Sequence, residues 1–187
     1  MIEIPSDLHP SLVPLVFLLG NWTGAGVADF PGEEKCNFGQ EVAFTHDGRD
    51  FLEYTSHTWV LDSEGAKVRP LETESGYWRV DEDRKVEVVM VRDQGVVEIW
   101  YGELADQKPQ IDLVTDAVAR TAASGPYSGG KRLYGYVNSD LMWVGEKSTP
   151  EVELRPYMSA HLKKTVDPSE WVKDLKDLPD DGVAFFK

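Results

Sequence analysis

The chain has 187 residues, a length typical of one domain, and its 33 acidic and 19 basic side chains give a formal charge of −14. Hydrophobic residues make up 41% of it, which is enough to bury a sizeable core. So acidic a protein is a poor partner for nucleic acid or for anionic membranes, because both need a basic surface. The single cysteine, Cys36, excludes an internal disulfide and a cysteine-cluster metal site.

The N-terminal segment has the pattern of a short helix. Its apolar stretch, residues 13–19, is shorter than the ~20 residues that a membrane span needs. Acidic residues Glu3 and Asp7 precede it, where a signal peptide carries positive charge. We therefore expect a cytoplasmic protein. Residues 8–19 are predicted to form a helical lid, which Pro14 limits or kinks.

Short strand-like runs separated by turn signals fill most of the remaining chain. An Asp-Gly pair within residues 46–49 marks a hairpin turn, and residues 62–65 form a second turn. Such regular spacing predicts an antiparallel sandwich or barrel, and it excludes alternating strands and helices. The predicted runs are 41–44, 50–61, 74–80, 85–91, 96–103, 110–118, 131–137 and 141–146.

The C-terminal residues predict a second helix. Residues 167–170 supply an N-cap, a proline at the first helical position and an early glutamate. Trp171, Leu175 and Leu178 then fall on one helical face. We therefore divide the chain into a β domain, 1–165, and an amphipathic tail, 166–187, that is packed on the barrel or appended to it. The apolar stripe of this tail also motivates a third class of function, an interaction module.

Other catalytic and ligand-binding motifs are incomplete in this sequence. Residues 125–132 nearly match a phosphate-binding loop, but Arg132 stands where that loop needs the Ser or Thr that holds Mg²⁺. The histidines lack the spacing of a zinc protease, and a nucleophile elbow is absent from the sequence. Glu72 and Glu74 fall on one face of a strand, a pattern that is typical of a solvated edge. The sequence therefore predicts no metal site.

The most informative motif is residues 20–26, which contain Gly20, Trp22, Gly24 and Gly26. Trp22 is suited to close one end of a barrel, and glycines at alternate positions let a strand bend or pack closely. This Gly-x-Trp-x-Gly-x-Gly run resembles the signature of the nitrobindin family, and the resemblance extends from about residue 8 to residue 164. Further segments that resemble the family are 38–42, 44–48, 71–79, 95–99 and 132–135.

The resemblance implies an all-β fold, an antiparallel and roughly ten-stranded barrel like those of lipocalins and fatty-acid-binding proteins. Short N-terminal and C-terminal helical segments and an internal apolar pocket belong to this expectation. In the family the pocket holds ferric haem b, and typical members bind nitric oxide and isomerise peroxynitrite to nitrate. One histidine near the C-terminus holds the iron, in a segment that resembles His-x-x-Ala-x-Leu-Lys-Arg.

The sequence departs from this pattern at the iron ligand. An ungapped alignment of residues 157–164 places Tyr157 where the family keeps its histidine, and His161 follows four residues later. Three hypotheses result: the pocket has lost haem; Tyr157 ligates ferric iron as a phenolate, assisted by Arg155 on the same strand face; or a local shift brings His161 to the iron. Tyr157 and His161 share a face in a regular strand or helix, so this spacing leaves both open.

We favour the first hypothesis. It describes a nitrobindin-like barrel without the normal haem site, which binds a small apolar ligand. The alternative is a ferric haem b protein that acts as a peroxynitrite isomerase, with Tyr157 or His161 as the axial ligand.

Overall fold

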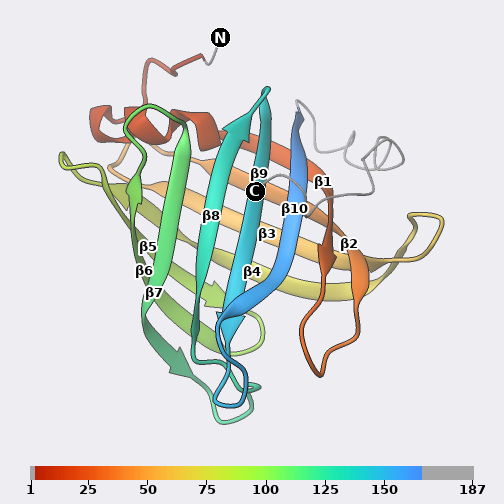
Figure 1. The fold of residues 1–187 in the computed structure, drawn as a ribbon. Helices are drawn as coiled ribbons and strands as arrows, with labels where there is room; N and C mark the ends of the chain where they lie inside the picture. The colour runs from red at the N-terminus through yellow and green to blue at the C-terminus, as the bar shows by residue number, and fades with distance from the viewer. Residues whose placement is uncertain (1–2, 166–187) are drawn as a thin grey trace.

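The computed structural model describes residues 3–165, which fold into a closed antiparallel barrel of ten strands (Figure 1). Each strand pairs with its neighbours in sequence, and β1 pairs with β10 to close the barrel. This confirms the predicted all-β barrel. The strands are β1 (Gly20–Ala28), β2 (Cys36–Thr45), β3 (Leu52–Leu61), β4 (Lys67–Val80), β5 (Lys85–Arg92), β6 (Val96–Leu104), β7 (Gln110–Arg120), β8 (Gly129–Val137), β9 (Asp140–Ser148) and β10 (Arg155–Thr165).

The predicted turns are stabilised as their residue types suggest. Gly48 and Gly65 adopt positive φ angles of 88° and 82°, which a residue with a Cβ rarely adopts. The Asp62 side chain accepts hydrogen bonds from the backbone N–H groups of Glu64 and Ala66, both at 2.9 Å. All eight predicted runs lie within or overlap strands. β4 begins well before its predicted start, and neither β1 nor β10 was among the predicted runs.

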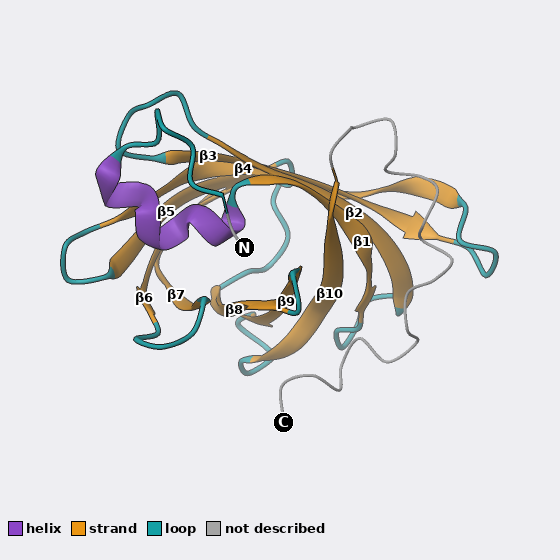
Figure 2. Ribbon diagram, turned by 90° about the horizontal axis from the view of Figure 1, so that it is seen from above, coloured by secondary structure: helices purple, strands orange, loops and turns teal. Residues whose placement is uncertain are grey.

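The N-terminal segment forms a 3-10 helix, η1 (Pro10–Leu18), which covers one end of the barrel (Figure 2). His9 caps it, since its ring accepts from the backbone N–H of Ser11 at 3.4 Å. The helical lid is therefore confirmed, although in a tighter form. Prolines at the first position and inside the segment remove backbone donors and limit an α-helix. The fully buried residues of η1 are Leu12, Leu15 and Leu18.

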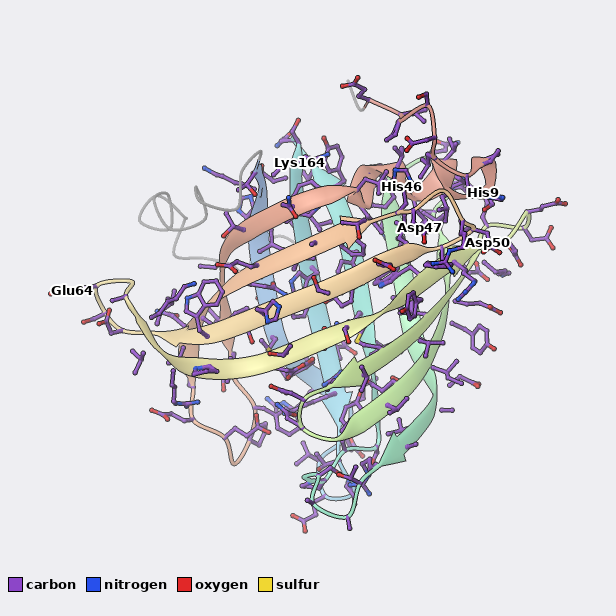
Figure 3. The ribbon with its side chains drawn as sticks, turned by 180° about the vertical axis from the view of Figure 1, so that it is seen from behind. His9, His46, Asp47, Asp50, Glu64 and Lys164 are labelled. Carbon is purple, nitrogen blue, oxygen red and sulfur yellow. The ribbon has the colours of Figure 1, made fainter. Side chains whose placement is uncertain are left out.

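The glycine–tryptophan motif builds the seam between β1 and β10. Trp22 is fully buried beneath η1, and its indole N–H donates to the carbonyl oxygen of Leu18 at 2.7 Å. Lys164 lies at the same end of the barrel (Figure 3), with its ammonium 5.5 Å from the Trp22 ring. A Cβ at Gly24 or Gly26 would collide with backbone carbonyls of β10. The motif thus allows β10 to approach β1 closely.

The predicted C-terminal helix and the proposed tail, 166–187, lie outside the described residues. Their boundary with the barrel therefore stays a prediction. Within residues 3–165, no helix is long and apolar enough to cross a membrane.

Candidate functional site

Charged side chains point into the barrel from four strands. Their positions are in phase with buried apolar residues, such as Met90 before Arg92 and Trp100 after Glu98. The side-chain exposure of this cluster, which we call the interior ion network, ranges from 0% to 11%. Its members are Glu72 and Glu74 on β4, Arg92 on β5, Glu98 on β6 and Arg132 on β8.

The prediction that Glu72 and Glu74 form a solvated edge is therefore wrong. Trp78 and Val80 are buried, and the period-2 alternation of β4 places Glu74 on the same inward face. The alternation of apolar residues along these strands could have identified these residues from the sequence. A charge in phase with a run of buried positions indicates an interior role, even though isolated strand carboxylates are usually exposed.

Arg132 and Glu74 form the centre of the network. Arg132 donates through both terminal nitrogens to the two carboxylate oxygens of Glu74, with Nη1 2.8 Å from Oε2. Tyr54 donates its hydroxyl to the same Oε2 at 2.8 Å. This bidentate geometry is the strongest form of an Arg–carboxylate contact, and it fixes both side chains in the barrel interior.

Arg92 joins a second group of residues. Its Nε lies 2.8 Å from Oε2 of Glu98 and 3.4 Å from Oε1 of Glu74, while its Nη1 lies 3.6 Å from Oε1 of Glu72. The guanidinium also stacks over the Tyr127 ring at 4.9 Å, and the Tyr127 hydroxyl donates to Glu98. Arg92 therefore connects the interior network to the Tyr127 side of the barrel.

Three carboxyl groups in this network face two guanidinium groups, and one proton balances the charge. Burial, with a contribution from neighbouring Glu74, raises the pKa of Glu72 to about 8. Burial acts in the same direction on Glu74, but Arg132 and Arg92 outweigh it and hold the pKa of Glu74 well below its usual range. Glu72 therefore keeps its proton into the neutral range, while Glu74 is ionised.

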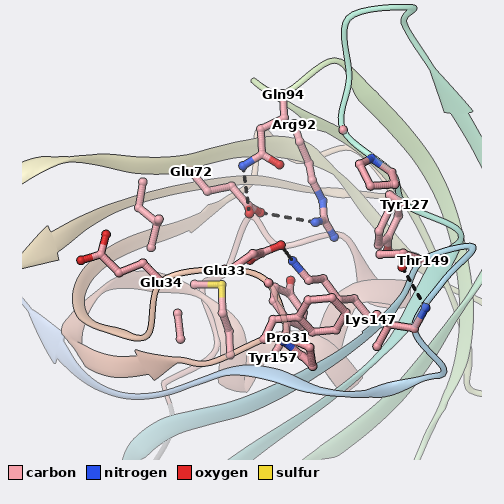
Figure 4. Close-up of a pocket in the computed structure, with 18 of the residues that line it drawn as sticks. Pro31, Glu33, Glu34, Glu72, Arg92, Gln94, Tyr127, Lys147, Thr149 and Tyr157 are labelled. Carbon is pink, nitrogen blue, oxygen red and sulfur yellow. Dashed lines mark hydrogen bonds and ion pairs between the residues drawn. The ribbon is translucent and has the colours of Figure 1, made fainter.

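A cavity of about 520 Å³ adjoins the network (Figure 4), and the loops after β1 and β9, which line it, lie at the end of the barrel opposite η1 (Figure 1). The loops after β1, β7 and β9 surround it. Its volume is within the range of small-molecule sites. The expected pocket was apolar, but many of the residues that line it are charged: Glu33, Glu34, Arg69, Glu72, Arg92, Lys147 and Glu151.

Tyr157 lines this cavity and is 6% exposed. Its hydroxyl oxygen accepts a hydrogen bond from Nη2 of Arg132 at 3.3 Å. Gly145 on the neighbouring strand makes room for the ring, since a Cβ there would lie 2.8 Å from Cε1 of Tyr157. Lys147 passes 5.0 Å from the ring centre and forms an ion pair with Glu33 at 2.6 Å (Figure 4).

His161 points away from the cavity. Its neighbours Ala160 and Leu162 belong to the core, and its Nε2 lies 2.6 Å from Oδ2 of Asp140. The expectation that Tyr157 and His161 share a face is wrong, because the pairing of β10 with β9 shifts register between residues 156 and 158. This bulge reverses the alternation that a regular strand maintains.

Arg155 does not assist Tyr157 either. It lies on the exposed part of β10, before the register shift. The cations that face the Tyr157 hydroxyl are Arg132 and Arg92, which come from distant parts of the sequence. Strand phase along β10 alone did not identify these two residues.

We tested whether the cavity supplies an iron ligand for haem. Among the residues that line it, only Cys36, Tyr127, Tyr157 and Met158 carry atoms that ligate haem iron, and none of them is a histidine. Burial raises the pKa of Tyr157 to about 12 despite Arg132 and Arg92, and it also raises the pKa of the Cys36 thiol. Iron could bind either group only by displacing a proton that burial retains, and a lone thioether is a weak ligand. The cavity therefore offers haem iron no histidine, and its other donors are a poor fit for the iron.

Within residues 3–165, His, Cys, Asp and Glu side chains form no group of three or more that is suited to hold a metal ion. The sequence predicted no metal site other than haem iron.

The fold is a closed ten-stranded barrel with a cavity whose volume is within the range of small-molecule sites. Residues 11–164 match the family described as "THAP4-like, heme-binding beta-barrel domain". The chain therefore belongs to the nitrobindin family, as the motif at residues 20–26 predicted.

Similar proteins carry two different names. The chain is 84% identical to a "Ferric nitrobindin-like protein" of Streptomyces griseus, over 100% of both chains. It is 42% identical to a "Peroxynitrite isomerase" of Nocardioides sp., over 86% of this chain and 96% of the relative. The crystal structure of Rv2717c from M. tuberculosis matches with a TM-score of 0.77 and 28% identity, over 85% of this chain and 99% of that one.

Proposed function

We propose that this protein is a haem-free member of the nitrobindin family, whose cavity binds a small organic ligand. The observation that carries the proposal is the environment of Tyr157, the residue that stands where the family keeps its iron ligand. Its hydroxyl is buried and accepts a hydrogen bond from Arg132, and burial raises its pKa to about 12 although Arg132 and Arg92 act in the opposite direction. Ferric iron would have to displace this proton to gain a phenolate ligand, and no histidine lines the cavity to take its place.

The orientation of His161 supports the same proposal. Its side chain lies on the outer face of β10, beside Asp140, and the β-bulge at residues 156–158 separates it from the cavity. Moving His161 to the cavity would require a slip of β10 by one residue against both neighbouring strands. Such a slip would also place Ala160 and Leu162 outside the core.

Titration of the purified chain with ferric haem tests the proposal. We expect no saturable Soret shift at one equivalent. A shift at one equivalent would contradict the proposal, and the variants Tyr157→Phe and His161→Ala would then identify the ligand, because only loss of the true ligand collapses the spectrum.

The second candidate is a ferric haem b protein that acts as a peroxynitrite isomerase, with Tyr157 or His161 as the axial ligand. The family description and the name of the Nocardioides relative favour it. The donors that line the cavity favour the haem-free form. The same haem titration separates the two candidates. A cytoplasmic location remains a prediction from the sequence.

A further inference from the structure

Two buried hydrogen-bond donors face the cavity without an acceptor among residues 3–165. The first is the guanidinium of Arg92, whose side chain is 4% exposed. Its Nε lies 2.8 Å from Glu98 and 3.4 Å from Glu74 but forms no hydrogen bond with the described residues, and its Nη1 lies 3.6 Å from the Glu72 oxygen. One edge of this guanidinium is therefore directed at the cavity (Figure 4).

The second donor is the hydroxyl of Tyr157. Its oxygen accepts from Arg132, and in the described part of the chain no group accepts its proton. Tyr157 and Arg92 line the same cavity, and the positive charge of Arg92 lowers the pKa of Tyr157. Buried donors in proteins are almost always satisfied by protein, water or ligand, so this pair marks where the acceptor group of a ligand would bind in place of water.

The shape of the donor pair selects the acceptor. A guanidinium edge presents two parallel N–H groups, which match the two oxygens of a carboxylate. Lys147, which is ion-paired with Glu33, lies above the Tyr157 ring at 5.0 Å from its centre. Glu72 carries its proton at neutral pH and does not repel an anion there.

The rest of the cavity wall selects the body of the ligand. Between the charged residues, apolar side chains line the wall: Phe30, Leu71, Val96, Val152 and Met158. An alkyl or aryl group would bury its surface against them. The volume of about 520 Å³ accommodates a molecule of medium size.

We propose that the cavity binds a monocarboxylate with an apolar body of medium length, and that Arg92 and Tyr157 hold its carboxylate. This inference rests on the proposed function, because it requires the cavity to be free of haem. It names the class of ligand, an alkanoate or an aryl-substituted alkanoate.

Calorimetric titration of the full chain with decanoate, and separately with decanol, tests the inference. The two probes share an apolar body, and only decanoate has the head group. We expect decanoate to bind at one equivalent, at least about tenfold more tightly than decanol, because a hydrogen bond to a charged group is worth that much. Tyr157→Phe should weaken decanoate binding about tenfold and leave decanol binding unchanged.

A matched control uses Tyr101→Phe, which removes a hydroxyl from a residue that is 44% exposed on β6. This variant should bind decanoate like the parent chain. Arg92→Lys is a second test of the head-group site, in which the charge remains and the two parallel donors are lost. Thermal unfolding of each variant establishes that it is folded, and Tyr157→Phe decides the test if Arg92→Lys fails to fold.

Equal affinity for decanoate and decanol, absence of decanoate binding, or an unchanged affinity in Tyr157→Phe would overturn the inference. None of these results affects the haem-free proposal. A stoichiometric Soret shift with haem would instead overturn the proposed function, and with it the basis of this inference. The two failures are therefore distinguishable.

Discussion

Replacing Glu72 with Gln should stabilise the barrel at alkaline pH. Glu72 faces Glu74 on its own strand, Arg92 on β5 and Arg132 on β8. Burial raises its pKa to about 8, from an ordinary value of 4.5. A glutamine has nearly the same shape as the protonated glutamic acid, and it has no proton to lose.

The sign of the effect follows from proton binding. Between pH 4.5 and about 8, the folded chain holds a proton on Glu72 that the unfolded chain has released. The free energy of unfolding therefore falls as the pH rises through this window, and the full penalty is present above pH 8. At about 1.4 kcal/mol for each pKa unit, the upper limit of this penalty is about 5 kcal/mol.

The assay is urea unfolding at pH 5, 7 and 9, followed by tryptophan fluorescence. We expect Glu72→Gln to match the parent chain at pH 5 and to exceed its free energy of unfolding by several kcal/mol at pH 9. The control is Glu87→Gln, an exposed residue on the outer face of β5, which should show no such trend. Parallel pH dependences of the parent chain and Glu72→Gln would refute a buried, protonated Glu72.

Three further predictions concern the barrel wall and the iron-ligand position. Gly145→Ala should destabilise the fold by about 1–3 kcal/mol in the same urea assay, because the new Cβ would lie 2.8 Å from the Tyr157 ring; an unchanged midpoint would mean that this ring is not held there. Trp22→Phe should lower the free energy of unfolding by about 1–3 kcal/mol, because the carbonyl oxygen of Leu18 loses the indole N–H that donates to it at 2.7 Å. A smaller loss would show that η1 does not depend on this hydrogen bond. Tyr157→His should raise the affinity for ferric haem, measured by the Soret shift, and an unchanged affinity would place the family's iron ligand elsewhere in the sequence.

The interior ion network raises the question of what it contributes to the fold. Replacing such a network with apolar residues is often neutral or stabilising, so its charges are weak evidence for stability. Removing only one partner of a buried ion pair is strongly destabilising, because the other charge stays buried without compensation. Loss of Arg132 would leave the Glu74 carboxylate, which is 6% exposed, without its bidentate partner. In this barrel the network also orients Arg92 and Tyr157 toward the cavity, which gives it a role in ligand binding under our proposal.

The sequence alone determined the strands and the family. Alternating apolar residues and Asp-Gly or Gly-containing turns are local signals, and they identified eight of the ten strands by pattern. The motif of Gly20, Trp22, Gly24 and Gly26 determined the family, because it meets a geometric requirement of the β1–β10 seam. β10 escaped pattern recognition, since its register shift at residues 156–158 interrupts the alternation.

Only the tertiary structure decided the chemistry of the interior. Glu74 and Arg132 are 58 residues apart in sequence, and barrel closure brings them into a bidentate contact. A single bulge turned Tyr157 inward and His161 outward, which no regular period would predict. Pairing between distant strands fixes which charges meet and which hydroxyl faces the cavity, and the linear sequence does not contain that information in a local form.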